Sequence, residues 1–137
     1  MNDNKYTRTI EVNISNDHIS GLLGESILKF FLKEKLIARD DKFYTITEKG
    51  WDFLEIIGID VNNLLQNKKI IEICADNKDG ILFEHIGSRL GVLIKEKWLE
   101  LTWLIYYHDK LILTEKGENG LKSLGINIKR VIANKNT

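Results

Sequence analysis

Apolar residues recur with a helical period in two stretches of the chain that lie 67 residues apart. Spacings of three and four residues place side chains on one face of a helix, and that face is the one expected to be buried. The pattern therefore predicts two equivalent amphipathic helices. Their apolar stripes are Leu23, Ile27 and Phe30 or Phe31 in the first stretch, and Leu90, Ile94 and Trp98 in the second.

Each helical stretch is followed by two short runs rich in branched and aromatic residues, with a polar turn between them. The runs are 36–39 and 43–46 in the first copy, and 104–107 and 111–113 in the second. Residues of these types favour strands, and polar turns of this length join antiparallel strands. Each pair of runs therefore predicts a β-hairpin.

A second helix is predicted after each hairpin. Thr47 and Thr114 stand where an N-cap belongs, and a Glu follows each of them, which suits the positive end of a helix. Gly58 and Gly125 follow the helical stretches and can supply a left-handed C-cap. Between the copies, Asp60 can cap a short helix over 61–67.

The two copies align without gaps, so that residues 18–65 correspond to 85–132, and Thr47-Glu48-Lys49-Gly50 is repeated as Thr114-Glu115-Lys116-Gly117. A repeat of this kind decides the architecture. We predict an α+β protein of two winged-helix-like units (helix, β-hairpin, helix), residues 1–67 and 68–137, packed as a pseudo-dimer. An extended stretch precedes each copy, at 9–14 with Ile10, Val12 and Ile14 on one face, and at 70–75.

Charge and composition narrow the function classes. The chain has 137 residues, 43% hydrophobic and 29% charged, with no net charge. Its second half carries a mild basic excess of 12 basic to 9 acidic residues, so it is the better half for contact with an anion. No apolar run approaches the roughly 18 residues of a spanning helix, so we expect no membrane association. A single cysteine, Cys74, favours the reducing cytoplasm.

Two segments carry a resemblance to a known family. Asp17-His18-Ile19-Ser20-Gly21-Leu22-Leu23-Gly24 resembles the D-H-L-A-G-x-L-G segment that follows the DNA-binding domain in some bacterial ArsR-family transcriptional regulators. The stretch 46–64 is similar to their L-T-P-A-G-x-x-W-F-x-x-L-G-I-D motif, and Cys74 precedes a second H-x-x-x-x-L-G unit that begins at His85. The resemblance implies the C-terminal accessory region of such a regulator without its N-terminal DNA-binding domain.

Six basic residues are the candidates for contact with double-stranded DNA. The helix before each hairpin is the one that enters the groove in winged-helix proteins, and the hairpin is the wing. The first helix is too apolar for this, which favours burial between the copies, whereas the second is more polar. The candidates are Arg89, Lys95 and Lys97 on the second helix, and Lys110, Arg39 and Lys42 at the hairpins.

Three further residues are candidates for a ligand or an interface. His18 and His85 occupy equivalent positions before a helix, where they can contact an anion, or cap the helix and bridge to the preceding strand. Trp51, early in a helix, suits either core packing or an interface with a partner or a second copy. Cys74 near His85 is expected to be a buried thiol, because structural zinc takes about four N or S ligands; we expect no metal and no cofactor.

No catalytic motif is present, so an enzyme is not expected. Two functions remain open. The duplication, the wings and the resemblance favour a transcriptional regulator that binds DNA directly or through a partner. The neutral charge and apolar helices favour a protein-interaction or small-ligand-sensing module on a winged-helix scaffold, since fold does not fix function.

Overall fold

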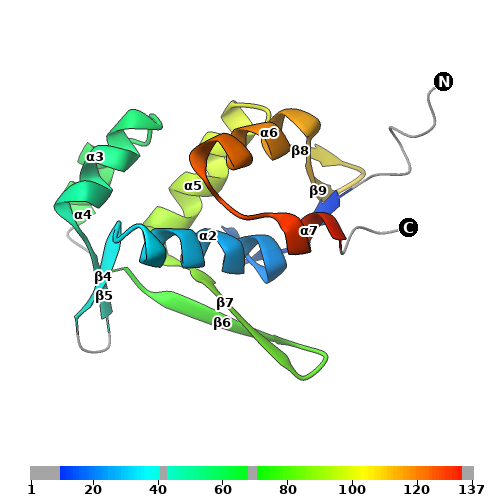
Figure 1. Cartoon of the computed structure of the whole chain (residues 1–137), viewed down its shortest axis with the longest axis horizontal. Coiled ribbons are helices and arrows are strands. Elements are labelled where there is room, and N and C mark those ends of the chain that lie inside the picture. The colour runs from blue at the N-terminus through cyan, green and yellow to red at the C-terminus, as the bar shows by residue number, and fades with distance from the viewer. Residues whose placement is uncertain (1–9, 41–42, 68–70, 134–137) are drawn as a thin grey trace.

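Helices and short antiparallel hairpins alternate along the chain in the computed structural model, which describes residues 10–40, 43–67 and 71–133 (Figure 1). The α+β class is thus confirmed. Within these residues, no helix is long and apolar enough to cross a membrane.

The same order of elements occurs in both halves of the chain: a hairpin, a helix, a second hairpin and two helices. The first half contains β1 Ile10–Val12, β2 Ile14–Ser15, β3 His18–Ile19, α2 Gly21–Lys33, β4 Ile37–Asp40, β5 Phe43–Ile46, α3 Glu48–Ile56 and α4 Val61–Asn67. The second half contains β6 Ile73–Lys78, β7 Ile81–Ile86, α5 Ser88–Glu100, β8 Leu104–Tyr107, β9 Lys110–Leu113, α6 Glu115–Leu124 and α7 Lys129–Ala133.

The predicted helix starts are confirmed by their hydrogen bonds. Thr47 Oγ1 accepts from the Gly50 amide at 3.0 Å, and Thr114 Oγ1 accepts from the Gly117 amide at 2.9 Å. Each bond satisfies one of the amides that a helix start leaves without an intrahelical partner. Asp60 Oδ1 caps α4 in the same way, accepting from the Asn63 amide at 3.1 Å.

Two hairpins at the start of the halves, β2–β3 and β6–β7, were not predicted. Their turns, Asn16-Asp17 and Asp79-Gly80, have positive φ at both residues, as do the predicted turn residues His108 and Asp109. Such turns match the right-handed twist of the strands. The β6–β7 hairpin is the longer one and extends away from the helices (Figure 1).

The extended stretch with Ile10, Val12 and Ile14 on one face is divided between two strands, β1 and β2. Ile10 and Val12 are buried, whereas Ile14 is 38% exposed. The reason is a change of partner, because β1 pairs with β9 while β2 pairs with β3. The side-chain alternation of a single strand therefore does not continue past Asn13.

The backbone of each half pairs with the second hairpin of the other half. Strand β1 pairs with β9, with Val12 opposite Leu111. Ile71 forms an isolated antiparallel bridge with Tyr44 through hydrogen bonds of 2.9 and 3.2 Å. Tyr44 and Leu111 are equivalent in the repeat, so the exchange is reciprocal.

The core lies where the helices of one half meet the hairpin of the other. Helix α2 packs against β7, and α5 packs against β3. The predicted stripes of both helices are buried, which confirms them. Since a helix stripe gains free energy only when it is removed from water, each half stabilises the other. The largest fully buried apolar side chains are Trp98, Leu36, Leu54, Leu90, Leu104, Leu111 and Leu121.

Candidate functional site

Two histidines from equivalent strands face each other where the halves meet. His18 on β3 is 7% exposed and His85 on β7 is fully buried. Their ring centroids are 5.7 Å apart. Neither imidazole caps the following helix, because the N-caps of α2 and α5 are Ser20 and Gly87. The two rings instead lie next to each other, tilted by 52°, where the halves meet, and His18 has a backbone hydrogen bond with Ser88 at the start of α5.

Glycines on the two helices allow this approach. A Cβ added at Gly24 would lie 2.9 Å from His85 Cβ, and one at Gly91 would lie 2.9 Å from His18 Cδ2. Both would also lie about 2.5 Å or less from a backbone carbonyl oxygen. Gly24 and Gly91 are equivalent in the repeat, so the two histidine contacts are reciprocal as well.

Cys74 completes a cluster with the two histidines. Its Sγ lies 4.0 Å from His18 Nδ1, and its backbone pairs directly with that of His85. A Cβ at Gly87 would lie only 2.4 Å from this sulfur, so the glycine leaves the space that the thiol occupies. Sequence reasoning missed this arrangement because His18 lies 56 residues away from Cys74.

The three groups are neutral at physiological pH. Burial lowers the pKa of His18 below 6.5, against a backbone hydrogen bond with Ser88 and the carboxylates of Asp17 and Asp76. Burial also lowers the pKa of His85 below 6.5, against the carboxylate of Asp76. Burial, together with Glu72 and Asp76, raises the pKa of the Cys74 thiol above 9.0. Neutral imidazoles keep a lone pair for a hydrogen-bond donor or a metal ion.

His85 has unused hydrogen-bonding capacity. Neither of its ring nitrogens makes a hydrogen bond with a described residue, although Nδ1 lies 3.5 Å from Asp76 Oδ2, within ion-pair distance for a protonated ring. The other oxygen of that carboxylate, Asp76 Oδ1, accepts from Ser15 Oγ at 3.2 Å. Buried polar groups without a partner are rare and mark places where a ligand or ion can bind.

One ring nitrogen of each histidine and the Cys74 sulfur lie within 4.8 Å of one another. We call His18, Cys74 and His85 the junction site. Two imidazoles and a thiol are donors that suit borderline and soft transition metals. The expectation of a buried thiol is wrong, because Cys74 is only half-buried. The fold also adds a second histidine to the pair Cys74 and His85, and the expectation that no metal binds here stays a prediction.

Of the predicted DNA contacts on α5, all three are engaged within the chain. Lys95 is 7% exposed, and its Nζ lies 3.5 Å from Asp17 Oδ1. Arg89 Nε donates to Asn63 Oδ1 at 2.9 Å, and Lys97 Nζ lies 2.7 Å from Glu100. The exposed side chains of this helix are those of Glu96 and Glu100, which are both acidic.

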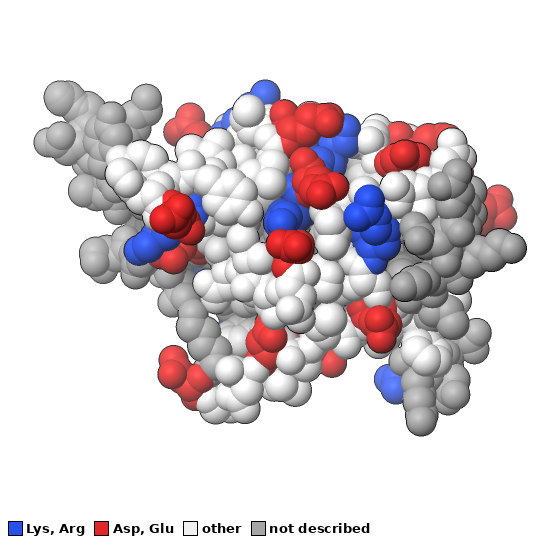
Figure 2. Space-filling view, turned by 180° about the vertical axis from the view of Figure 1, so that it is seen from behind, with Lys and Arg blue, Asp and Glu red and all other residues white. Residues whose placement is uncertain are grey.

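The candidates at the hairpins do not extend a basic surface from α5. Lys110 is exposed but lies 3.7 Å from Glu11, Arg39 is exposed on β4, and Lys42 is outside the described residues. Figure 2 shows basic and acidic side chains alternating over one face of the molecule, without a continuous basic stripe. DNA contact by these residues stays a prediction.

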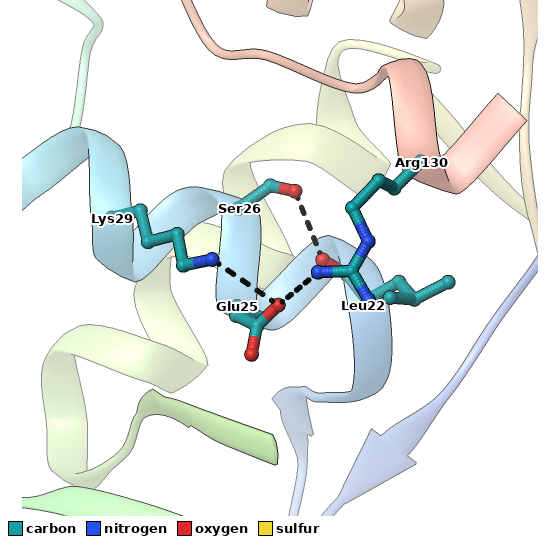
Figure 3. A network of polar contacts seen from close by, with 5 residues as sticks. All are labelled: Leu22, Glu25, Ser26, Lys29 and Arg130. Atoms are coloured by element: carbon teal, nitrogen blue, oxygen red, sulfur yellow. Dashed lines mark hydrogen bonds and ion pairs between the residues drawn. The ribbon is translucent and has the colours of Figure 1, made fainter.

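A shallow hollow lies between α2 and the C-terminal segment. Arg130 of α7 and Lys29 both point toward Glu25, at 3.0 and 3.6 Å, while Ser26 donates to the Leu22 carbonyl (Figure 3). The hollow has a volume of about 230 Å³. Pockets for small organic ligands are larger, about 300–1,000 Å³, so this hollow is small for such a ligand.

Trp51 is half-buried on α3 and packs against the core, which leaves its predicted interface role as a prediction. Comparison with family models, curated proteins and solved structures found no match. The resemblance to ArsR-family regulators therefore rests on the residue patterns alone, and function has to be inferred from the junction site and the surface.

Proposed function

We propose that the two halves are winged-helix-like units packed as a pseudo-dimer, and that the chain is a sensing module that receives a small ligand or ion at the junction site. In this proposal the module does not enter a DNA groove itself. It regulates through a partner, as the resemblance to the accessory region of transcriptional regulators implies.

The observation that carries the proposal is the position of the helices before the wings. Both α2 and α5 pack against the hairpin of the opposite half, and the exposed side chains of α5 are acidic. A recognition helix needs polar and basic side chains directed toward bases and phosphates. Acidic side chains there would be repelled by the phosphates, so α5 is better suited to holding the halves together.

The test is a titration of mixed-sequence duplex DNA with the full chain, followed by fluorescence anisotropy at low and physiological salt. The proposal predicts no saturable binding at micromolar protein even at low salt, where phosphate contacts are strongest. Salt-sensitive binding that Lys110→Glu or Arg39→Glu weakens would overturn it and favour direct DNA contact. Both side chains are exposed, so these variants should fold.

A further inference from the structure

We propose that the junction site binds one divalent transition-metal ion of the Zn²⁺ class through His18, Cys74 and His85. The inference deepens the proposed function, because it names the chemical class of the signal that the sensing module receives.

The donor set fits such an ion. Zn²⁺ takes imidazole nitrogen at about 2.0–2.1 Å and thiolate sulfur at about 2.3 Å, so its tetrahedral ligands lie roughly 3.3–3.8 Å apart. The three donor atoms lie within 4.8 Å of one another before any ion is bound, with 4.0 Å between Cys74 Sγ and His18 Nδ1. Side-chain movements of about 1 Å would bring the three donor atoms to the distances that tetrahedral coordination requires. Three protein ligands leave a fourth position for water or a carboxylate.

The surroundings favour a cation. Asp17, Glu72 and Asp76 all act electrostatically on these groups, against the single ammonium of Lys95. Lys95 is itself paired with Asp17. The carboxylate of Asp76 stands beside His85, an arrangement that typically orients a metal-binding imidazole.

The unsatisfied nitrogens of His85 are an independent indication. A fully buried imidazole without a hydrogen-bond partner among the described residues loses its bonds to water on folding without replacing them. Coordination of an ion would satisfy one nitrogen. Cys74 is only half-buried, and Asp76 lines an open surface hollow with Ser15 and Asn77, so an ion has a route to the site.

Binding would join the two halves, because His18 comes from the first and the other ligands from the second. An ion that binds the folded chain and not the unfolded one raises its stability. At a hundredfold excess over the dissociation constant, the midpoint of thermal unfolding should rise by about 5–10 °C. Thiolate coordination also releases the thiol proton, so binding should weaken as pH falls.

The experiment is a Co²⁺ titration of the untagged, chelator-treated full chain, read by optical absorption, with Zn²⁺ as competitor. We expect one Co²⁺ per chain, visible bands typical of four-coordinate Co²⁺, a near-ultraviolet thiolate-to-cobalt band, and loss of all bands on adding Zn²⁺. Absence of the thiolate band in the native chain would overturn the proposal.

Three variants locate the site. Cys74→Ser keeps the size of the side chain and should abolish the thiolate band and raise the dissociation constant at least about 100-fold. His18→Gln should weaken binding by a similar factor. His108→Gln is the matched control, because His108 lies in the β8–β9 turn beside Tyr107 and should leave binding unchanged. Unchanged Co²⁺ binding by a folded Cys74→Ser variant would show that the ion binds elsewhere and would overturn the proposal.

A measurement on the native chain covers the case in which these variants fail to fold. Alkylation of Cys74 by iodoacetamide should be slowed at least tenfold by saturating Zn²⁺, and an unchanged rate would contradict the proposal. Failure here is distinguishable from failure of the proposed function. If the chain binds both Co²⁺ and DNA, only the proposed function is overturned. If the chain binds neither Co²⁺ nor DNA, only the proposed metal site is overturned.

Discussion

The hairpins that open the two halves share a scaffold but differ in their chemistry. Ser15 stands opposite His18 in the register of β2–β3, as Cys74 stands opposite His85 in β6–β7. Ser20 occupies the position before α2 that Gly87 occupies before α5. The histidines are thus kept in both halves, while the sulfur and the glycine beside it occur in one.

This difference shows how two hairpins with the same strand register can place one sulfur beside two equivalent histidines. The reciprocal features, namely the strand exchange and the histidine–glycine contacts, serve the folding of both halves. The features present once, Cys74 and the space left by Gly87, serve the proposed coordination of an ion. Variants of equivalent positions can test this division.

The strand exchange should carry much of the stability that links the halves. Ile71 is 3% exposed at the bridge to Tyr44, so Ile71→Ala should lower the free energy of unfolding by about 3 kcal/mol. Urea unfolding followed by circular dichroism measures this. Ile81→Ala is the control, because Ile81 is 57% exposed and should change the value by less than about 0.5 kcal/mol. Equal effects would show that burial of the Ile71 side chain at the bridge contributes nothing, because alanine keeps the backbone hydrogen bonds.

The glycines of α2 and α5 should respond alike. Alanine in a helix interior normally stabilises a chain by about 1 kcal/mol relative to glycine. At both Gly24 and Gly91 the added Cβ would meet a backbone carbonyl oxygen as well as a histidine side chain, so each alanine variant should instead destabilise by about 2 kcal/mol. Thermal unfolding of both variants measures this.

Gly80→Asn is the control for the glycine variants. Gly80 has nothing within 4 Å of an added Cβ, and asparagine tolerates its positive φ. A loss of stability at Gly24 but not at Gly91 would show that the two histidine contacts are not equivalent.

The missing sulfur can be added to the first half. The double variant Ser15→Cys/Ser20→Gly should place a second thiol beside the junction site, with room beside it of the kind that Gly87 provides for Cys74. A fourth N or S ligand should tighten Zn²⁺ binding by about 10-fold or more, measured in competition with a chelator. Ser15→Cys alone should raise the Zn²⁺ affinity less, because the Ser20 side chain remains in the space that the added thiol needs. Equal affinities for the two variants would contradict the equivalence of the hairpins.

The stability of the metal-free chain should depend on pH. The pKa of His18 and of His85 is below 6.5 in the folded chain, mainly because both are buried. Below pH 6.5 the unfolded chain therefore binds protons that the folded chain does not, and stability falls. A backbone hydrogen bond with Ser88 and the carboxylates of Asp17 and Asp76 oppose this effect at His18, while Lys95 adds to it. At His85, Asp76 opposes the effect and His18 adds to it. Urea midpoints at pH 7.5 and 5.5 should show the decrease, and equal midpoints would contradict it.

Local order was predictable from the sequence, and the contacts between the halves were not. The helix stripes and the caps at Thr47 and Thr114 follow from short-range spacing, and they are confirmed. The turn dipeptide Asp79-Gly80 is a hairpin signal that could have revealed β6–β7.

Of the site, the equivalence of His18 and His85 was visible in the repeat, but their meeting was not. It depends on α2 and α5 packing against the opposite hairpins, and long-range packing leaves no periodic signal. Lys95 shows the same limit, because a lysine on a polar helix gave no sign that it would be buried beside Asp17. The position of Asp76 beside His85 and Ser15 was not predictable either, because it depends on how β6 packs against β7 and β2.

Coordination of the ion by Cys74 and the two histidines is tested by X-ray absorption spectroscopy at the zinc edge on the full chain loaded with one equivalent of Zn²⁺. We expect one sulfur at about 2.3 Å and two imidazole nitrogens at about 2.0–2.1 Å in the first coordination sphere. A coordination sphere of oxygen and nitrogen without sulfur would contradict it, because Cys74 would then not be a ligand and the junction site would not be where the ion binds.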